Sequence, residues 1–526
     1  ALYFGMSVIN IITNKSKLES ENGISISATH LLLDKNSSFI LANNQILNIP
    51  TITINEGSTL TLSGSETITA NILTLSGNST VTIIPEKILS LTIPNITITA
   101  GSSISADQKG YGPNSGPGAS LIGNIGASYG GLSLGGITTS IYGSATKPID
   151  LGSGGYYFGG GAIRLIVSNI LTNNGVISAG GNSSSSGGSI YVTAKNIIGN
   201  GTFSANGGGL FAMGYFKSPG GGGRVALHYQ TSSFSGKAEA KGGCGSYDGY
   251  SASCGQNGTV GFFDESTNNF YVNSSWQFRT NDSPFVFNNI FISNGAKVTS
   301  ESGVTITANN ITIDGASTFT LSGNEIINAE NLSLTGNSTI SVVPENILTL
   351  TISNIVVNPG SIISADDEGY LVGPGSPDTE VGASHGGRGG GATAKPVYGS
   401  ATAPVDFGSG TRGHRGGGAI RLVVSNILKN DGIISADGRY EHTSGGSIYV
   451  NSNKISGNGS FQANGGNSSW PNGLIGGGGG RIAIYFQESS FIGAATAKAG
   501  VYCFYGCAPA GEAGTVVMES AEPVCT

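Results

Sequence analysis

The sequence predicts an all-β fold: a parallel β-helix (solenoid) of about 16 turns with Gly-rich loop excursions, built as two tandem superunits that form one continuous rod. Three observations predict this fold class. A short phrase of alternating apolar and small polar residues recurs at intervals of about 21 residues. The whole pattern returns about 260 positions later, as from Asn78 to Asn337. In the second half of each superunit, the strands begin with runs of Gly.

The first hundred residues carry the phrase most clearly, as Asn-Ser-Thr-Val-Thr-Ile at 78–83. Its copies in the first superunit begin at regularly spaced positions: Asn14, Asn36, Gly57, Asn78 and Gly101. Segments 59–62, 66–69 and 71–75 alternate polar residues with Ile or Leu, which is the period of a strand with one buried face. Three such strands within one interval predict a triangular turn.

After Ala106 the strands alternate with Gly-rich excursions. The longest runs from Asp107 to about Phe158, and a strand then opens with Gly-Gly-Gly-Ala-Ile-Arg-Leu at Gly159. Gly is expected where the chain bends sharply or where backbone packs against backbone. Because the same strand pattern closes each run, ordered loops are favoured over flexible linkers.

The second superunit repeats the first, so we predict the domains 1–262 and 263–526. Its Gly-started strands return at Gly416, Gly445 and Gly478. No charged or Pro-rich linker separates the two superunits, and this predicts that the second stacks continuously on the first.

Composition excludes several classes of partner. The net charge is -7, only 10% of the residues are charged, and no basic cluster is present, so nucleic acid is not expected as a partner. No stretch has the 18 or more consecutive apolar residues of a membrane span.

The sequence begins at Ala1 without a visible leader, as a secreted protein does after processing, although a trimmed chain would look the same.

Neither end of the predicted solenoid carries a polar cap. Residues 1–5 are largely apolar, and the tail Thr515-Val516-Val517-Met518 matches Thr259-Val260-Gly261-Phe262, which precedes the second superunit. An uncapped end exposes backbone and apolar side chains. We therefore expect head-to-tail association of copies into an open homopolymer. The alternative is a piece cut from a longer chain.

The five cysteines point to an oxidising compartment. Cys244 and Cys254 lie in one excursion, and Cys503 and Cys507 lie in the matching excursion of the second superunit. This recurrence predicts two local disulfides rather than zinc sites, because His is scarce and no four-ligand cluster is present. Cys525 is left over, and we interpret it as a thiol that could pair between chains.

Asn-x-Ser/Thr sequons suggest covalent glycans. The strongest candidates occupy matching turns of the two superunits: Asn78 with Asn337, and Asn200 with Asn458. The other candidates are spread along the chain: Asn14, Asn36, Asn95, Asn182, Asn257, Asn273, Asn310, Asn331 and Asn467.

The sequence shows no clear catalytic or ligand-binding motif, so we expect no enzymatic activity, no metal and no cofactor. The candidate charged groups occur in both superunits, as repeated structural ion pairs would: Asp107 with Asp366 and Asp367, Asp150 with Asp406, Arg164 with Arg421, and Arg224 with Arg481. No Ser-His-Asp order, P-loop or calcium-binding nonapeptide is present. Outward Thr columns would suit an ice-binding face, but Thr also simply suits exposed strands.

The segments Gly-Gly-Ser-Ile-Tyr-Val at 187–192 and 445–450, and Gly-Gly-Gly-Arg-Ile-Ala-Ile at 478–484, resemble the Gly-rich repeats of large secreted surface proteins of unicellular eukaryotes. These are adhesin-like and mastigoneme-type filament proteins. The resemblance implies a parallel β-helix with an extracellular structural or adhesive role, and it carries over no catalytic residue. We therefore expect a subunit of an extracellular, glycosylated filament or surface fibre. The alternatives are a carbohydrate-binding adhesin and a polysaccharide lyase or hydrolase.

Overall fold

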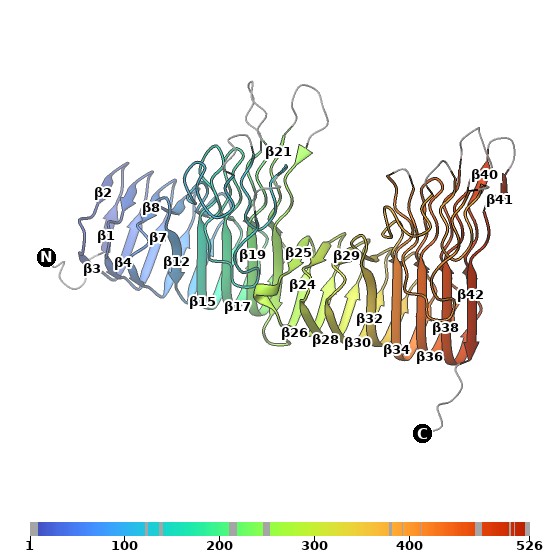
Figure 1. Ribbon diagram of the computed structural model, residues 1–526. Helices are drawn as coiled ribbons and strands as arrows, with labels where there is room; N and C mark the ends of the chain where they lie inside the picture. Colours follow the sequence, from blue (N-terminus) through green and yellow to red (C-terminus); the bar gives the residue numbers. More distant parts are fainter. Residues whose placement is uncertain are drawn as a thin grey trace. The chain divides into compact units, whose positions relative to one another are not determined.

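The computed structural model describes residues 9–120, 125–135, 140–209, 218–245, 253–377, 381–391, 393–411, 413–468, 476–503, 507–509 and 511–520. The chain divides into two compact units, Ala1–Gln277 (unit 1) and Phe278–Thr526 (unit 2). Within each unit, parallel strands from successive turns lie side by side (Figure 1). The predicted all-β parallel β-helix is confirmed.

Unit 1 has three strand-lined faces. The first face contains β1 (Ile9–Ile12), β4 (His30–Leu33), β7 (Thr51–Ile54), β10 (Ile72–Leu75), β13 (Asn95–Ile98), β15 (Ala162–Asn173), β17 (Ser189–Gly199), β19 (Arg224–Phe234) and β23 (Thr259–Asp264). The second contains β2 (Lys17–Glu19), β5 (Ser38–Ile40), β8 (Thr59–Leu62), β11 (Thr80–Ile83), β14 (Ser103–Ser105), β16 (Val176–Ser178), β18 (Thr202–Ser204) and β20 (Lys237–Glu239). The third contains β3 (Ser25–Ser27), β6 (Ile46–Asn48) and β9 (Thr67–Thr69). Strand β12 (Ile88–Thr92) lies against β9 but pairs with β15.

Unit 2 repeats this arrangement with longer strands. Its long strands are β26 (Phe285–Ile292), β28 (Thr305–Ile313), β30 (Ile326–Leu334), β32 (Ile347–Val357), β34 (Ala419–Asn430), β36 (Ser447–Gly457), β38 (Arg481–Phe491) and β42 (Thr515–Ser520). Its short strands are β27 (Lys297–Ser300), β29 (Thr318–Leu321), β31 (Thr339–Val342), β33 (Ile362–Ser364), β35 (Ile433–Ser435), β37 (Ser460–Gln462) and β39 (Ala494–Thr496). The remaining elements are β21 (Cys244–Gly245), β22 (Ser253–Cys254), β24 (Asn269–Val272), β25 (Ser275–Phe278), η1 (Thr280–Asp282), β40 (Val501–Cys503) and β41 (Cys507–Pro509).

The repeated phrase forms a corner of each turn. Its first residue has the left-handed backbone that Asn and Gly tolerate best, with φ of 58° at Asn36, 64° at Asn78 and 84° at Gly101. The Ser that follows is buried and reaches the adjacent turn: the Ser58 hydroxyl accepts a hydrogen bond from the Ser37 N–H at 3.0 Å. The phrase recurs because each turn needs the same bend and the same internal hydrogen bond.

Alternation in the strands produces columns of stacked apolar side chains. Leu33, Ile54, Leu75 and Ile98 are in parallel register and are each 0% exposed. A fully buried aliphatic side chain contributes about 1.5–3 kcal/mol to stability. The stack is therefore stabilised by many similar contacts between neighbouring turns, as in other solenoids.

In unit 1, long bent strands begin where the Gly-rich excursions begin, whereas in unit 2 long strands such as β28 and β30 come before the first excursion. Strand β15 pairs with both β12 and β13, so this single strand spans the two faces that β12 and β13 occupy in the preceding turn. Its register with β17 shifts between Val167 and Ile170, and β34 shifts against β36 between Val424 and Ile427. Such irregularities bend a strand. Each unit therefore has a bend in its long strands at the same place.

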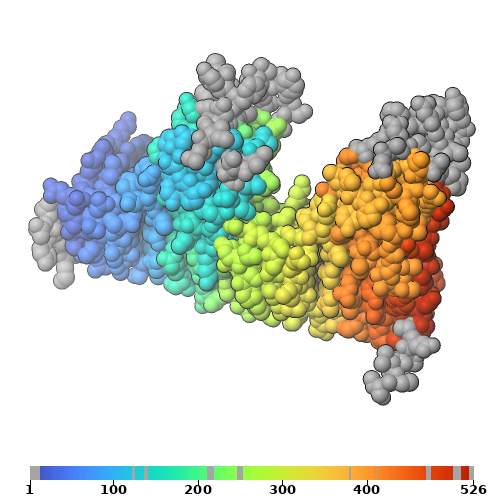
Figure 2. Space-filling model, viewed as in Figure 1, coloured from blue at the N-terminus to red at the C-terminus, as the bar shows by residue number. Residues whose placement is uncertain are grey.

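Gly residues let the excursions pack backbone against backbone. A Cβ added to Gly188 would lie 1.9 Å from the Gly161 carbonyl oxygen, and one added to Gly446 would lie 1.9 Å from that of Gly418. In Figure 2 the excursion after Ala106 is seen as a light-blue to cyan mass over unit 1. These Gly runs are ordered parts of the fold rather than linkers.

The division between the units falls later than the predicted boundary after residue 262. The reason is that β24 turns back to pair antiparallel with β23. An aromatic cluster then forms, in which the Phe270 ring lies 4.7 Å from Phe263 and 4.8 Å from Trp276. Residues up to Gln277 are thereby held in unit 1.

Candidate functional site

Two buried arginines fasten the long excursion to the strands. Arg224 is 0% exposed, and its Nη2 and Nε donate to the Tyr142 carbonyl at 2.9 and 3.2 Å. Its guanidinium also lies over the Tyr129 ring, 5.3 Å from the centroid. In unit 2, Arg481 donates to the Tyr398 carbonyl at 2.9 Å. Burial holds the pKa of Arg481 below its ordinary value. The two arginines serve a structural role, because their donors are directed at backbone carbonyls of the excursion and at threonine hydroxyls of the next strand.

The carboxylates of Asp107 and Asp366 accept hydrogen bonds from backbone N–H groups of the following turn. Asp107 accepts from the Gly180 N–H at 2.5 Å and from the Ser178 hydroxyl at 2.7 Å. Its counterpart Asp366 accepts from the Asp437 N–H at 2.6 Å. The carbonyl of Asp150 accepts from the Ser189 hydroxyl at 2.5 Å, as that of Asp406 accepts from Ser447. Arg164 and Arg421 are exposed on β15 and β34.

Unit 2 gathers further carboxylates around Asp366, and we call Asp366, Asp367, Glu368 and Asp437 the acidic cluster. Asp366 forms an ion pair with Arg439, and Asp367 accepts from the Arg439 N–H at 2.8 Å. Burial, together with the charge of neighbouring carboxylates, raises the pKa of Glu368 to about 7 and that of Asp437 to about 6. Unit 1 has Gln108, Lys109 and Gly180 in the corresponding positions.

This cluster predicts that unit 2 becomes less stable as pH rises. The folded pKa of Glu368 lies above its ordinary value of 4.5, so its contribution is complete below that value and is lost as pH rises through about 7. We expect Glu368→Gln to remove about 1–2 kcal/mol of this pH dependence, discounted for partial solvent screening. Hydrogen exchange of β33 and β35 between about pH 5 and pH 8 measures it. Exposed Glu330→Gln is the control, and equal profiles for the two variants would contradict the prediction.

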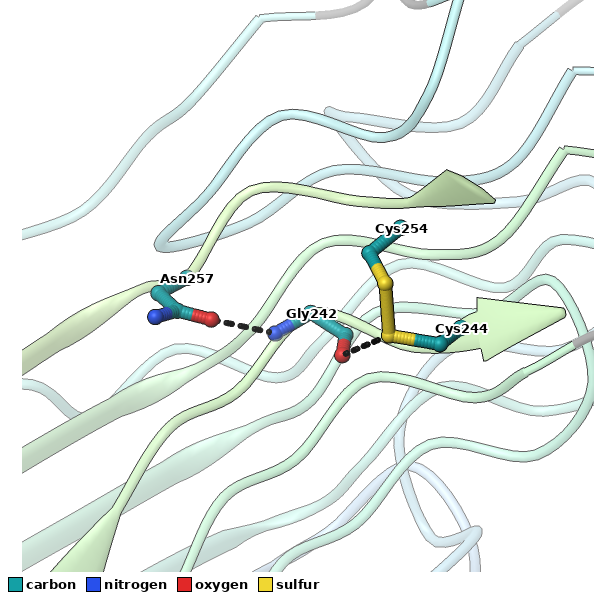
Figure 3. The surroundings of a disulfide bond; sticks show 4 residues. All are labelled: Gly242, Cys244, Cys254 and Asn257. Atoms are coloured by element: carbon teal, nitrogen blue, oxygen red, sulfur yellow. Dashed lines mark hydrogen bonds between the residues drawn. A yellow bond between two sulfur atoms is a disulfide. The ribbon is translucent and has the colours of Figure 1, made fainter. Parts of the chain in front are cut away.

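The cysteine pair of unit 1 closes a hairpin at the tip of an excursion. Cys244 and Cys254 are opposite one another on β21 and β22 and form a disulfide, with the Cys244 sulfur facing the Gly242 carbonyl (Figure 3). The Gly242 N–H donates to the Asn257 side chain at 3.1 Å. In unit 2 the backbones of Cys503 and Cys507 pair in the same way on β40 and β41. Their side chains, and Cys525, lie outside the described residues.

The predicted glycan acceptors differ in accessibility. Most are exposed: Asn14, Asn36, Asn78, Asn200, Asn257, Asn273, Asn337, Asn458 and Asn467. The remaining four are half-buried: Asn95, Asn182, Asn310 and Asn331. Asn78 and Asn337 occupy the same left-handed corner of their units, with φ of 64° and 62°. Glycosylation at these positions stays a prediction.

Two of the half-buried acceptors belong to an asparagine ladder. The Asn310 amide donates to Asn289 at 2.6 Å, and the Asn331 amide donates to Asn310 at 2.8 Å. Asn354 and Asn426 extend the ladder at 2.9 and 2.7 Å. The amide nitrogen that a glycan would need is thus already used between turns. The sequence alone could not predict this use of the side chains, because a sequon reads the same whether or not its asparagine bonds to the next turn.

No protein-family model matches the sequence, and neither curated proteins nor solved structures give a match. Among the described residues, no helix has the length and hydropathy needed to cross a bilayer. In the same part of the chain, no group of three or more His, Cys, Asp or Glu side chains is arranged to hold a metal ion.

Proposed function

We propose that the protein is a structural subunit of an extracellular, glycosylated filament or surface fibre, and that its copies associate head to tail. The polar groups that the sequence offers as candidate catalytic residues mostly hold one turn to the next. The disulfide of unit 1 fits an oxidising compartment. The exposed sequons fit a glycan-covered surface.

The observation that carries the proposal is the apolar face of β42. Val516 and Met518 stack in register on Ile482 and Ile484 of the core, yet they are 44% and 37% exposed. At the corresponding position of unit 1, Val260 is 0% exposed. Among the described strands, only β38 pairs with β42, so one edge of β42 offers unpaired backbone groups.

Unit 1 has a similar face at β2. Leu18 is in register with buried Phe39, so it occupies a core position, but it is 45% exposed. A second copy that stacked its β2 turn on the β42 turn would bury both apolar faces and extend the parallel sheets. Such a contact is heterologous and does not close, so it generates a filament.

The experiment is to remove the apolar face of β42 in the full chain. We expect Met518→Asp to abolish assembly, because a carboxylate would have to be buried against a core position of the next copy. Val372→Asp is the matched control, since Val372 is 82% exposed in an excursion. Particle length is measured by electron microscopy and light scattering. Monodisperse monomers of the unmodified protein at all concentrations would refute head-to-tail assembly.

A further inference from the structure

A groove crosses three successive turns of unit 1. It has a volume of about 500 Å³ and is lined by β15, β17 and β19 near Val167, Ala194 and Tyr229. It lies beside the register shift between Val167 and Ile170, where β15 bends. Because neighbouring strands are about 4.8 Å apart, the groove can receive an extended ligand lying across the strands.

Two lysines and one glutamate line the groove, in a chain of net charge -7. Lys147, from the long excursion, and Lys195, from β17, both line it and are exposed. No described carboxylate lies within ion-pairing distance of either ammonium group. By contrast, Lys17, Lys237 and Lys454 each pair with a glutamate.

His228 holds the floor of the groove in place. Its Nε2 lies 2.8 Å from the Thr146 carbonyl and its Nδ1 lies 2.6 Å from the Glu265 carboxylate. Glu265, which also lines the groove, is thus hydrogen-bonded to His228 and is not ion-paired with Lys147 or Lys195. The bond to Thr146 also fixes the segment that carries Lys147. The lining thus holds two ammonium groups, those of Lys147 and Lys195, against the one carboxylate of Glu265.

Aromatic side chains complete the lining. The Tyr191 ring lies edge-on to His228 at 5.4 Å, and Tyr229 lines the groove beside it. A tyrosine offers an apolar ring face together with a polar hydroxyl group. This combination suits the C–H faces and hydroxyls of a sugar.

Unit 2 has the same bend without the charges. Ala403 stands in place of Lys147, Asn453 in place of Lys195, and Tyr485 in place of His228. The Tyr485 hydroxyl donates to the Thr402 carbonyl at 2.8 Å, so a neutral side chain holds the segment that carries Ala403. The fold is thus built without these cations in unit 2, which indicates that the lysines of unit 1 serve something other than folding.

We propose that this groove binds an acidic polysaccharide, with carboxylate or sulfate groups held by Lys147 and Lys195 and a sugar ring packed on Tyr191. The site does not depend on filament assembly. A protein that failed to assemble could still bind the polysaccharide, and the reverse also holds.

Binding is tested by calorimetry on the full chain. The probes are an oligogalacturonate, a heparin-derived oligosaccharide and, as the neutral control, a malto-oligosaccharide of equal length. We expect one or both acidic probes to bind in about 50 mM salt and to bind at least about tenfold more weakly in about 500 mM salt. The neutral probe is expected not to bind.

The variant Lys147→Ala/Lys195→Asn carries the residues of unit 2, so it should fold and should lose about tenfold or more in affinity. Lys498→Ala, an exposed lysine of unit 2, is the matched control and should bind as the unmodified protein does. Three results would each overturn the proposal: no binding of either acidic probe, equal affinity in the double variant, or equally tight binding of the neutral probe or of duplex DNA.

Discussion

A single methyl group at Gly188 is expected to cost unit 1 about 3 kcal/mol or more. The new Cβ would lie 1.9 Å from the Gly161 oxygen and 2.5 Å from atoms of Gly160, all of them backbone. No side chain can move aside to make room. Relief would require separating two turns, and the hydrogen bond that the Ser189 N–H donates to the Gly161 carbonyl at 2.9 Å opposes this.

The matched control is Gly112→Ala in the neighbouring excursion. There the nearest atoms to an added Cβ lie at 3.5 and 3.8 Å, which is ordinary contact. We expect the free energy of unfolding to change by no more than about 0.5 kcal/mol. Alanine lowers the conformational entropy of the unfolded chain, and this gain offsets any small strain in the folded state. Thermal unfolding and hydrogen exchange of β15 and β17 measure both variants. Equal stability of the two would mean that the Gly runs are loosely packed linkers.

The fold could be predicted from the sequence because its causes are local and repeated. The corner at Asn78 requires a left-handed residue followed by a small buried one, and Gly101 and Ser102 meet the same need in the next turn. Alternation in β11 and β13 shows directly which side chains point inward. A requirement that recurs in every turn leaves a periodic pattern.

The groove of unit 1 could not be predicted in the same way, because it depends on pairs that are distant in sequence and that unit 2 does not repeat. His228 meets Thr146 from the long excursion and Glu265 after β23. No spacing in the sequence indicates either contact. The available signal was a difference between superunits at matched positions, such as Lys195 opposite Asn453. Repetition reveals the scaffold, and departures from repetition mark where the two units differ in chemistry.

Replacing Arg224 by methionine is expected to destabilise unit 1 by about 3 kcal/mol. Methionine fills much of the same space but cannot donate to the Tyr142 carbonyl or to the Thr259 hydroxyl, which lies 3.3 Å from Nη1. A buried acceptor without its donor costs about 1–3 kcal/mol. Removing the buried charge recovers part of that cost, because the desolvation penalty of the guanidinium disappears. We still expect a net loss of stability, because the guanidinium donates several hydrogen bonds at once.

The loss should be concentrated where the excursion meets the strands. Hydrogen exchange near Tyr142 is expected to rise by about a hundredfold. Strands β2 and β5, which lie well before β14 and the excursion in the order of turns, should keep their protection. Arg164→Met on the exposed face of β15 is the control and should change stability by less than about 0.5 kcal/mol. If Arg224→Met were instead more stable than the unmodified protein, desolvation of the guanidinium would outweigh its hydrogen bonds. The arginine would then be retained for a reason other than fastening the excursion.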